Sequence, residues 1–143
     1  MTNFNHYENG LDLLSPNRNL APISTEIDEK GSLIVGGCKL SNLAETYGTP
    51  LYVIDEDTIR IACRAYRESL KQYYPGPSLA LYASKANSSL TISALVSSEH
   101  LGVDVVSEGE LLTAISGGVP KEKIVFHGNN KSDQELRLAY KYG

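Results

Sequence analysis

The sequence predicts an α/β fold in which parallel strands alternate with helices. Apolar runs of strand length recur from residue 50 onward, and each is followed by a segment with a helix cap or helical apolar spacing. This alternation favours a parallel sheet covered by helices. The runs are continuously apolar, which is typical of strands buried on both faces. Four such units fit a small open doubly wound sheet or half of an eight-unit barrel, and periodicity does not choose between the two.

The N-terminal part of the sequence shows a different pattern. Residues 1–31 are rich in Asn, Ser, Pro and Glu without sustained periodicity, so we expect an extended arm or a partly disordered segment there. The apolar residues 33–35 predict one short strand, and the helix that follows is capped by Ser41 and ended by Gly48. Residues 1–49 are therefore expected to form an arm, a short strand and a linker helix.

The four strand–helix units then follow in order. Strands are expected at residues 51–54, 79–83, 103–106 and 124–126. Helices are expected over residues 59–70, 89–99, 107–116 and 132–140, with Gly102 ending the second of them. Ser107 with Glu110, and Ser132 with Glu135, have the spacing of a capping box, in which each side chain bonds to the other residue's backbone amide.

Composition excludes several classes of protein. The 143 residues are 41% apolar and 21% charged, as in a soluble globular protein. A formal net charge of −4 argues against a general nucleic-acid binder but not against a phosphate-bearing cofactor. No apolar run is long enough to span a membrane and the N-terminus lacks a signal-peptide pattern, so we expect a cytoplasmic protein. Cys38 and Cys63 form no CxxC pair and no histidine has a spaced partner, so we expect no metal site.

Polar side chains follow the predicted strands at their carboxyl ends, where parallel α/β folds place their functional groups. These residues are Asp55, residues 84–87, Ser107 and residues 127–130, and Asp104 lies within its strand near the same end. No GxxxxGK[ST] loop occurs and no GxGxxG follows the first strand, which weakens a nucleotide-binding alternative.

Lys85 directly follows an apolar strand. A lysine that is partly desolvated in such a place loses its proton more easily and attacks a carbonyl carbon, although position alone is more typical of a solvated turn residue. Asp104 lies between valines, where a buried carboxylate is costly unless a cation or donor meets it, and Lys85 is a candidate partner. His127 has a cleft position, but a lone histidine there is more often a hydrogen-bonding loop residue.

Three segments carry a family resemblance: LYASKAN at 81–87, GVDVVSEGEL at 102–111 and KIVFHGNNKSDQEL at 123–136. In order and spacing they resemble segments of the meso-diaminopimelate decarboxylases, which belong to the alanine-racemase-like group of pyridoxal-phosphate enzymes. PLYVIDEDTIR at 50–60 resembles the start of that family's barrel, and GGCKLSNLAETYGTP its preceding linker. The resemblance extends over most of the chain.

The resemblance implies that residues 50–143 form the first half of a (β/α)8 TIM-type barrel. Lys85 matches the catalytic lysine that forms the Schiff base with pyridoxal 5'-phosphate, and Asp104 matches a strand carboxylate close to that lysine, so both are cofactor-binding candidates. Glu110 matches an acidic position of sister amino-acid decarboxylases, although its capping spacing alone explains it. Two further candidates at the same end of the sheet are His127 and Asn129.

The implied activity is the decarboxylation of meso-diaminopimelate to L-lysine, a step of lysine biosynthesis. The implied partners are a small amino-acid substrate and, in the full-length form, a second copy, with no nucleic acid or membrane. Family members are much longer, and their later phosphate loops and substrate-recognising arginine have no counterpart here, so we expect an N-terminal fragment that is inactive alone. The alternatives left open are an ornithine or arginine decarboxylase, an alanine racemase, a noncatalytic truncated α/β stub, and a small binding domain without a covalent cofactor.

Overall fold

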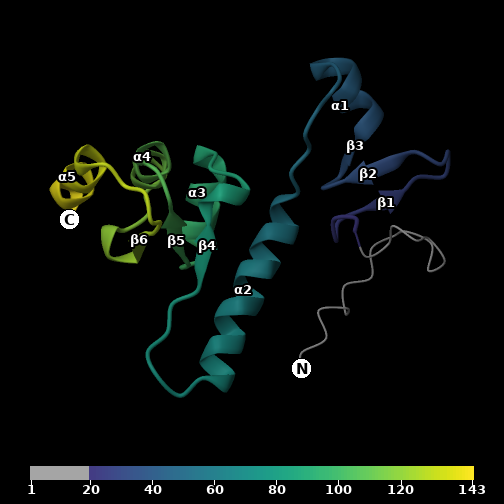
Figure 1. The fold of residues 1–143 in the computed structure, drawn as a ribbon. Coiled ribbons are helices and arrows are strands. Elements are labelled where there is room, and N and C mark those ends of the chain that lie inside the picture. The colour runs from purple at the N-terminus through teal and green to yellow at the C-terminus, as the bar shows by residue number, and fades with distance from the viewer. Residues whose placement is uncertain (1–19) are drawn as a thin grey trace. The chain divides into compact units, whose positions relative to one another are not determined.

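The computed structural model describes residues 20–143, and the chain divides into two compact units, Met1–Ile59 and Arg60–Gly143 (Figure 1). The part of the expected arm over residues 1–19 lies outside the described residues. No helix within residues 20–143 is both long and apolar enough to cross a membrane.

The first unit holds a three-stranded antiparallel sheet in the order β1–β2–β3. Its elements are β1 (Glu26–Ile27), β2 (Leu33–Val35), β3 (Cys38–Lys39) and helix α1 (Leu40–Tyr47). The expectation of one short strand is therefore wrong, because two tight turns fold neighbouring segments back onto 33–35. The helix also begins one residue before Ser41, with no side-chain cap.

Each of these turns has a local cause. Gly36 and Gly37 have φ values of 57° and 75°, which a two-residue type I′ hairpin requires and glycine adopts without strain. In the turn between β1 and β2, the Asp28 carboxylate accepts hydrogen bonds from the backbone N–H groups of Lys30 at 3.0 Å and Ser32 at 2.7 Å. Two adjacent glycines are a hairpin signal that the sequence interpretation overlooked, whereas the aspartate turn shows only in the hydrogen bonds.

The strand expected at residues 51–54 is absent. These residues are extended but form no ladder, and Tyr52 is 97% exposed. An apolar run becomes a strand only where a neighbour pairs with its backbone groups, and no described strand does so here. The parallel sheet therefore has three strands instead of four.

The second unit contains this parallel sheet, in the order β4–β5–β6. The strands are β4 (Leu81–Ala83), β5 (Gly102–Val105) and β6 (Ile124–Phe126), all at expected places. The helices are α2 (Glu56–Tyr73), which starts in the first unit, α3 (Leu90–Ser98), α4 (Glu108–Ser116) and α5 (Asp133–Tyr142), with 3-10 turns η2 (Ser84–Ala86) and η3 (Lys121–Lys123). The predicted alternation of strands and helices is confirmed for these units.

The two faces of the parallel sheet differ. Val103 and Val105 are fully buried, and β5 contacts α3 and α4. Successive side chains of a strand point to opposite faces, so Asp104 lies on the other face. There Val125, which is in register with Asp104, remains 45% exposed. A sheet covered on one face is the arrangement of a barrel segment, whose inner face is filled from across the barrel, and not of a doubly wound sheet.

Helices α3 and α4 end with the same backbone motif. At the end of α4 the Val119 N–H donates to Ala114 O at 3.1 Å, and Gly118 has φ 79°. At the end of α3 the Leu101 N–H donates to Val96 O at 3.2 Å, but the left-handed position is held by His100 with φ 66°. These are Schellman ends, for which glycine is the usual residue.

The expected role of Gly102 as the helix end is therefore wrong. Gly102 is the first residue of β5, and its N–H donates to Ala80 O at 2.9 Å. A Cβ atom at this position would lie 2.6 Å from Leu81 Cδ2 and would collide with the Lys123 carbonyl oxygen. Gly102 is present because the neighbouring chains approach it closely.

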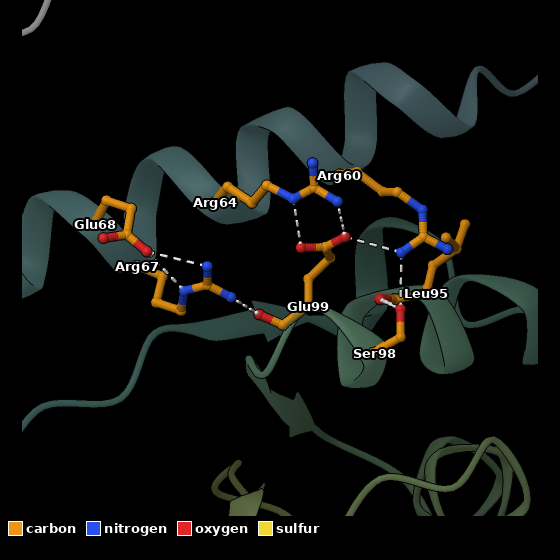
Figure 2. Close-up of polar contacts among 7 residues, drawn as sticks. All are labelled: Arg60, Arg64, Arg67, Glu68, Leu95, Ser98 and Glu99. Atoms are coloured by element: carbon orange, nitrogen blue, oxygen red, sulfur yellow. Dashed lines mark hydrogen bonds and ion pairs between the residues drawn. The ribbon is translucent and has the colours of Figure 1, made fainter.

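An arginine–glutamate cluster ties α2 to the end of α3 (Figure 2). The Glu99 side chain is only 6% exposed and accepts hydrogen bonds from Arg60 Nη1 at 2.8 Å and from two nitrogens of Arg64. Arg67 Nη1 donates to the Glu99 carbonyl oxygen at 3.0 Å. The hydrogen bonds from Arg64 and Arg60 lower the pKa of the Glu99 carboxyl from 4.5 to about 2.

Candidate functional site

The register of the parallel sheet places three side chains in one row near the carboxyl ends of the strands. Ala83 pairs with Asp104, and Asp104 pairs with Val125. Lys85 follows two residues after Ala83, and His127 two residues after Val125. The predicted candidates therefore lie at the same end of the sheet: Asp104 within β5, Lys85 in the turn after β4, and His127 directly after β6.

Lys85 lies in the 3-10 turn η2, immediately after β4. Ser84 before it is buried at 2% exposure, whereas Lys85 itself is exposed. No salt bridge within residues 20–143 joins Lys85 to Asp104, so the structure does not bring these two candidates into ion-pair contact. Lys85 is thus accessible to solvent just beyond the carboxyl end of β4.

Asp104 is instead paired with His127. Asp104 Oδ2 lies 3.8 Å from His127 Nδ1, and the two side chains are 28% and 68% exposed. Asp104 Oδ1 is shielded from solvent and has no hydrogen-bond partner. The His127 N–H donates to Val105 O at 2.9 Å, which continues the ladder beyond β6. The site thus offers one carboxylate oxygen that still requires a donor.

Sequence reasoning missed the Asp104–His127 pair, although the signal was present. Residues that are in register on neighbouring parallel strands share a face, and so do residues two positions further along. Aligning the apolar runs at 103–106 and 124–126 would have placed His127 diagonally beside Asp104. The sequence interpretation considered only Lys85 as the partner of Asp104.

Glu110 is engaged with the backbone. Its Oε2 accepts a hydrogen bond from the Val106 N–H at 2.9 Å, while Ser107 Oγ accepts one from the Glu110 N–H at 3.3 Å. The expected capping box is thus only half right here, because the glutamate bonds to Val106 instead of Ser107. The Ser132–Glu135 box is complete, as predicted.

Two other strand-end candidates take different positions. Asp55 is 8% exposed and accepts hydrogen bonds from Ser24 Oγ at 2.6 Å and from the Thr58 N–H at 2.9 Å, so it caps α2. Burial raises the pKa of the Asp55 carboxyl, but the hydrogen bonds from Ser24 and Thr58 outweigh burial and lower it. Asn129 is exposed in the loop after β6, where Gly128 has φ 122°. No group of three potential metal ligands occurs within residues 20–143.

A parallel sheet of strand–helix units that is covered on one face, with polar side chains at the carboxyl ends of its strands, has the architecture of a (β/α) barrel segment. Residues 56–143 match the family model for the pyridoxal-dependent decarboxylase, pyridoxal binding domain. The chain belongs to the pyridoxal-dependent decarboxylase family. This finding supports the barrel fold and the pyridoxal cofactor that the resemblance implied.

Individual relatives agree with this assignment. The chain is 48% identical over 133 residues to a diaminopimelate decarboxylase of Synechocystis, covering 87% of this chain and 28% of the relative. It also resembles the crystal structure of diaminopimelate decarboxylase from M. jannaschii in complex with L-lysine, with a TM-score of 0.77, 38% identity, and coverage of 83% of this chain and 28% of that one. The chain therefore spans little more than a quarter of the length of these relatives.

A relative with another substrate is more distant. The lysine/ornithine decarboxylase from Vibrio vulnificus, whose structure contains cadaverine, matches with a TM-score of 0.64 and 28% identity. The match covers 73% of this chain and 27% of that one. The fold is thus shared by decarboxylases acting on different amino acids.

The described residues fit a pyridoxal group. Lys85 supplies an accessible amine for an aldehyde, and the unpartnered Oδ1 of Asp104 supplies an acceptor for a cationic or hydroxyl donor.

Proposed function

We propose that this chain is the N-terminal part of a pyridoxal-phosphate-dependent decarboxylase that converts meso-diaminopimelate to L-lysine. The observation that carries the proposal is the position of Lys85, which is exposed in the turn directly after β4, the first strand of a parallel sheet that matches the family model. The names of the relatives at 48% and 38% identity support the substrate. In this proposal, residues 50–143 supply the first half of the barrel and residues 1–49 precede it.

The chain's own residues have distinct tasks in this reaction. Pyridoxal phosphate supplies an electron sink for the charge left when carbon dioxide departs. Lys85 would hold the cofactor through its Nζ atom, at the position where the substrate amino group must bind. Asp104, in register with Ala83 on the adjacent strand, would offer its unpartnered Oδ1 atom as an acceptor at the same end of the sheet. Glu110 orders the start of α4 through its bond to Val106 and is assigned no chemical step.

The remaining parts of the proposal concern the whole protein. The complete polypeptide is a cytoplasmic homodimer, and its further segments supply the groups that bind the cofactor phosphate and read the substrate. The family resemblance supports these assignments. Asn129, exposed beside His127, is retained as a candidate contact for cofactor or substrate.

A decarboxylase of lysine or ornithine is the second candidate, favoured by the likeness to the Vibrio vulnificus enzyme. Offering the complete polypeptide each amino acid separately and measuring carbon dioxide release distinguishes the two. We expect release from meso-diaminopimelate, with little from ornithine or L-lysine. The reverse order would move the substrate assignment to the second candidate.

The role of Lys85 is tested by chemical trapping. Borohydride reduction of the cofactor-loaded protein, followed by peptide mapping, should locate the label on Lys85. Lys85→Arg keeps the positive charge and should abolish both label and turnover. Label on Lys30, Lys39 or Lys131 instead would refute the assignment.

A further inference from the structure

Asp104 and His127 lie within ion-pair distance of each other at the carboxyl end of the parallel sheet, the same end at which Lys85 lies. We propose that His127 is a positioning residue, which fixes one oxygen of Asp104 so that the other oxygen remains available to the cofactor or its lysine. This inference rests on the proposed function, because it concerns how the pyridoxal site is prepared. It adds a role for His127 that the position of Lys85 does not require.

The strand register brings the pair together. Asp104 is in register with Val125, and His127 lies two residues beyond Val125 on the adjacent strand. The His127 N–H donates to Val105 O, so the histidine backbone is held by the sheet ladder and not left to the loop. The backbone hydrogen bond therefore fixes the position from which the imidazole reaches the Asp104 carboxylate.

The two oxygens of Asp104 have different surroundings. Oδ2 lies 3.8 Å from His127 Nδ1, and no other basic group within residues 20–143 lies within ion-pair distance of this carboxylate. Oδ1 is shielded from solvent and has no hydrogen-bond donor. A shielded carboxylate oxygen without a donor is unfavourable, so this geometry favours a ligand that provides one.

The distance between His127 Nδ1 and Asp104 Oδ2 indicates how the histidine can restrain the carboxylate. A separation of 3.8 Å is within ion-pair range but longer than a hydrogen bond, so a small side-chain rotation is enough to bring Nδ1–H onto Oδ2. With Oδ2 held in this way, the rotation of the carboxylate is restricted. Oδ1 then stays on the side that has no protein donor, where a ligand donor completes its bonding.

The test measures pyridoxal phosphate affinity in the complete polypeptide, using the absorbance of the bound cofactor. His127→Ala should weaken binding roughly tenfold, as expected for a lost hydrogen bond to a charged group. His127→Asn, whose amide N–H can take the place of Nδ1–H, should recover most of the affinity. His127→Gln, whose amide lies one bond farther out, should not.

A double-mutant cycle tests whether His127 acts through Asp104. In an Asp104→Asn background, His127→Ala should change the affinity by less than about twofold, because residues that act as a unit are not additive. An unchanged affinity in His127→Ala alone, or an equal loss in both backgrounds, would overturn the proposal. His100→Asn is the matched control at the opposite end of β5 and should bind as the wild type does.

Failure of the proposed function has a separate signature. If the wild-type protein yields no borohydride-fixed cofactor on Lys85, the pyridoxal assignment itself fails. If it does yield that adduct and the cycle shows no coupling between His127 and Asp104, only the positioning role fails. Circular dichroism and thermal midpoints of the cofactor-free variants exclude misfolding as the cause of a lost affinity.

Discussion

Arg64 holds the carboxylate of Glu99 through two parallel hydrogen bonds, from Nε to Oε2 at 2.8 Å and from Nη2 to Oε1 at 2.7 Å. The contact joins residues 35 positions apart in the sequence. Because Glu99 directly follows α3, this pair fixes the long helix α2 against the end of the helix that precedes β5 (Figure 2). Bidentate arginine–carboxylate pairs of this kind are stronger than single ion pairs.

Glu99→Gln should destabilise the protein by about 1–2 kcal/mol at pH 7, since it removes charge from hydrogen bonds that are partly open to solvent. The pKa of Glu99 is about 2 in the folded state, against an ordinary 4.5. Its contribution is therefore fully present above pH 4.5 and is lost as the pH falls towards 2. Acid unfolding of both proteins checks this, because the variant should lack that part of the pH dependence. Glu68→Gln, at an exposed pair with Arg67, is the control and should behave as the wild type.

His100→Gly should stabilise the protein by about 1 kcal/mol, because His100 holds a left-handed conformation that costs a side chain free energy. The matched position at the end of α4 predicts the opposite sign. Gly118→Ala, at φ 79°, should destabilise by about 1 kcal/mol. Thermal midpoints of the two variants and the wild type are compared. Equal shifts in the same direction would contradict the assignment of His100 to the helix end.

Gly102→Ala should destabilise the protein by about 1–3 kcal/mol through overpacking. The added methyl group would meet Leu81 Cδ2 at 2.6 Å and the backbone of Lys123. Gly109→Ala is the matched control, since its Cβ would meet no atom within 4 Å in helix α4. It should be neutral or stabilising by up to about 1 kcal/mol because alanine favours helix. Denaturant midpoints measure both variants.

The substitutions above are measured in the complete polypeptide. The isolated 143-residue chain, in contrast, should show no decarboxylase activity and no sharp thermal transition. Leu81 and Val125 are 39% and 45% exposed. Each large apolar side chain left uncovered forfeits on the order of 1.5–3 kcal/mol, against a net domain stability of about 5–15 kcal/mol. Differential scanning calorimetry and carbon dioxide release with added cofactor test this. A cooperative monomeric transition together with turnover would show that the chain functions by itself.

The sequence was most informative where a local signal and its partner lie close together along the chain. The run Ile124–Phe126, the cap at Ser132 and the helix after it were all predicted, because apolar spacing and capping are local properties. Residues 51–54 have an equally good apolar pattern but form no strand, because pairing depends on a neighbour that the pattern does not describe.

Residue type alone led to wrong expectations at two positions of strand β5, Gly102 and Asp104. Gly102 suggested a helix end, but it serves close packing, while the helix end belongs to His100. Asp104 suggested a lysine partner, but the register gives it His127. In both cases the deciding information is which strands are neighbours and in what alignment, and this alignment is a tertiary property.

The one-sided cover of the parallel sheet has a consequence for synthesis on the ribosome. Each strand of β4–β5–β6 pairs with the strand next to it in sequence, so the outer helical layer can assemble in the order in which the chain emerges. In the barrel that we propose, the inner face around Val125, which is 45% exposed here, would be covered only by strands translated later. A nascent chain of this length is therefore expected to expose the apolar inner face of the sheet. Chaperones that bind apolar surfaces are expected to bind it until the barrel closes.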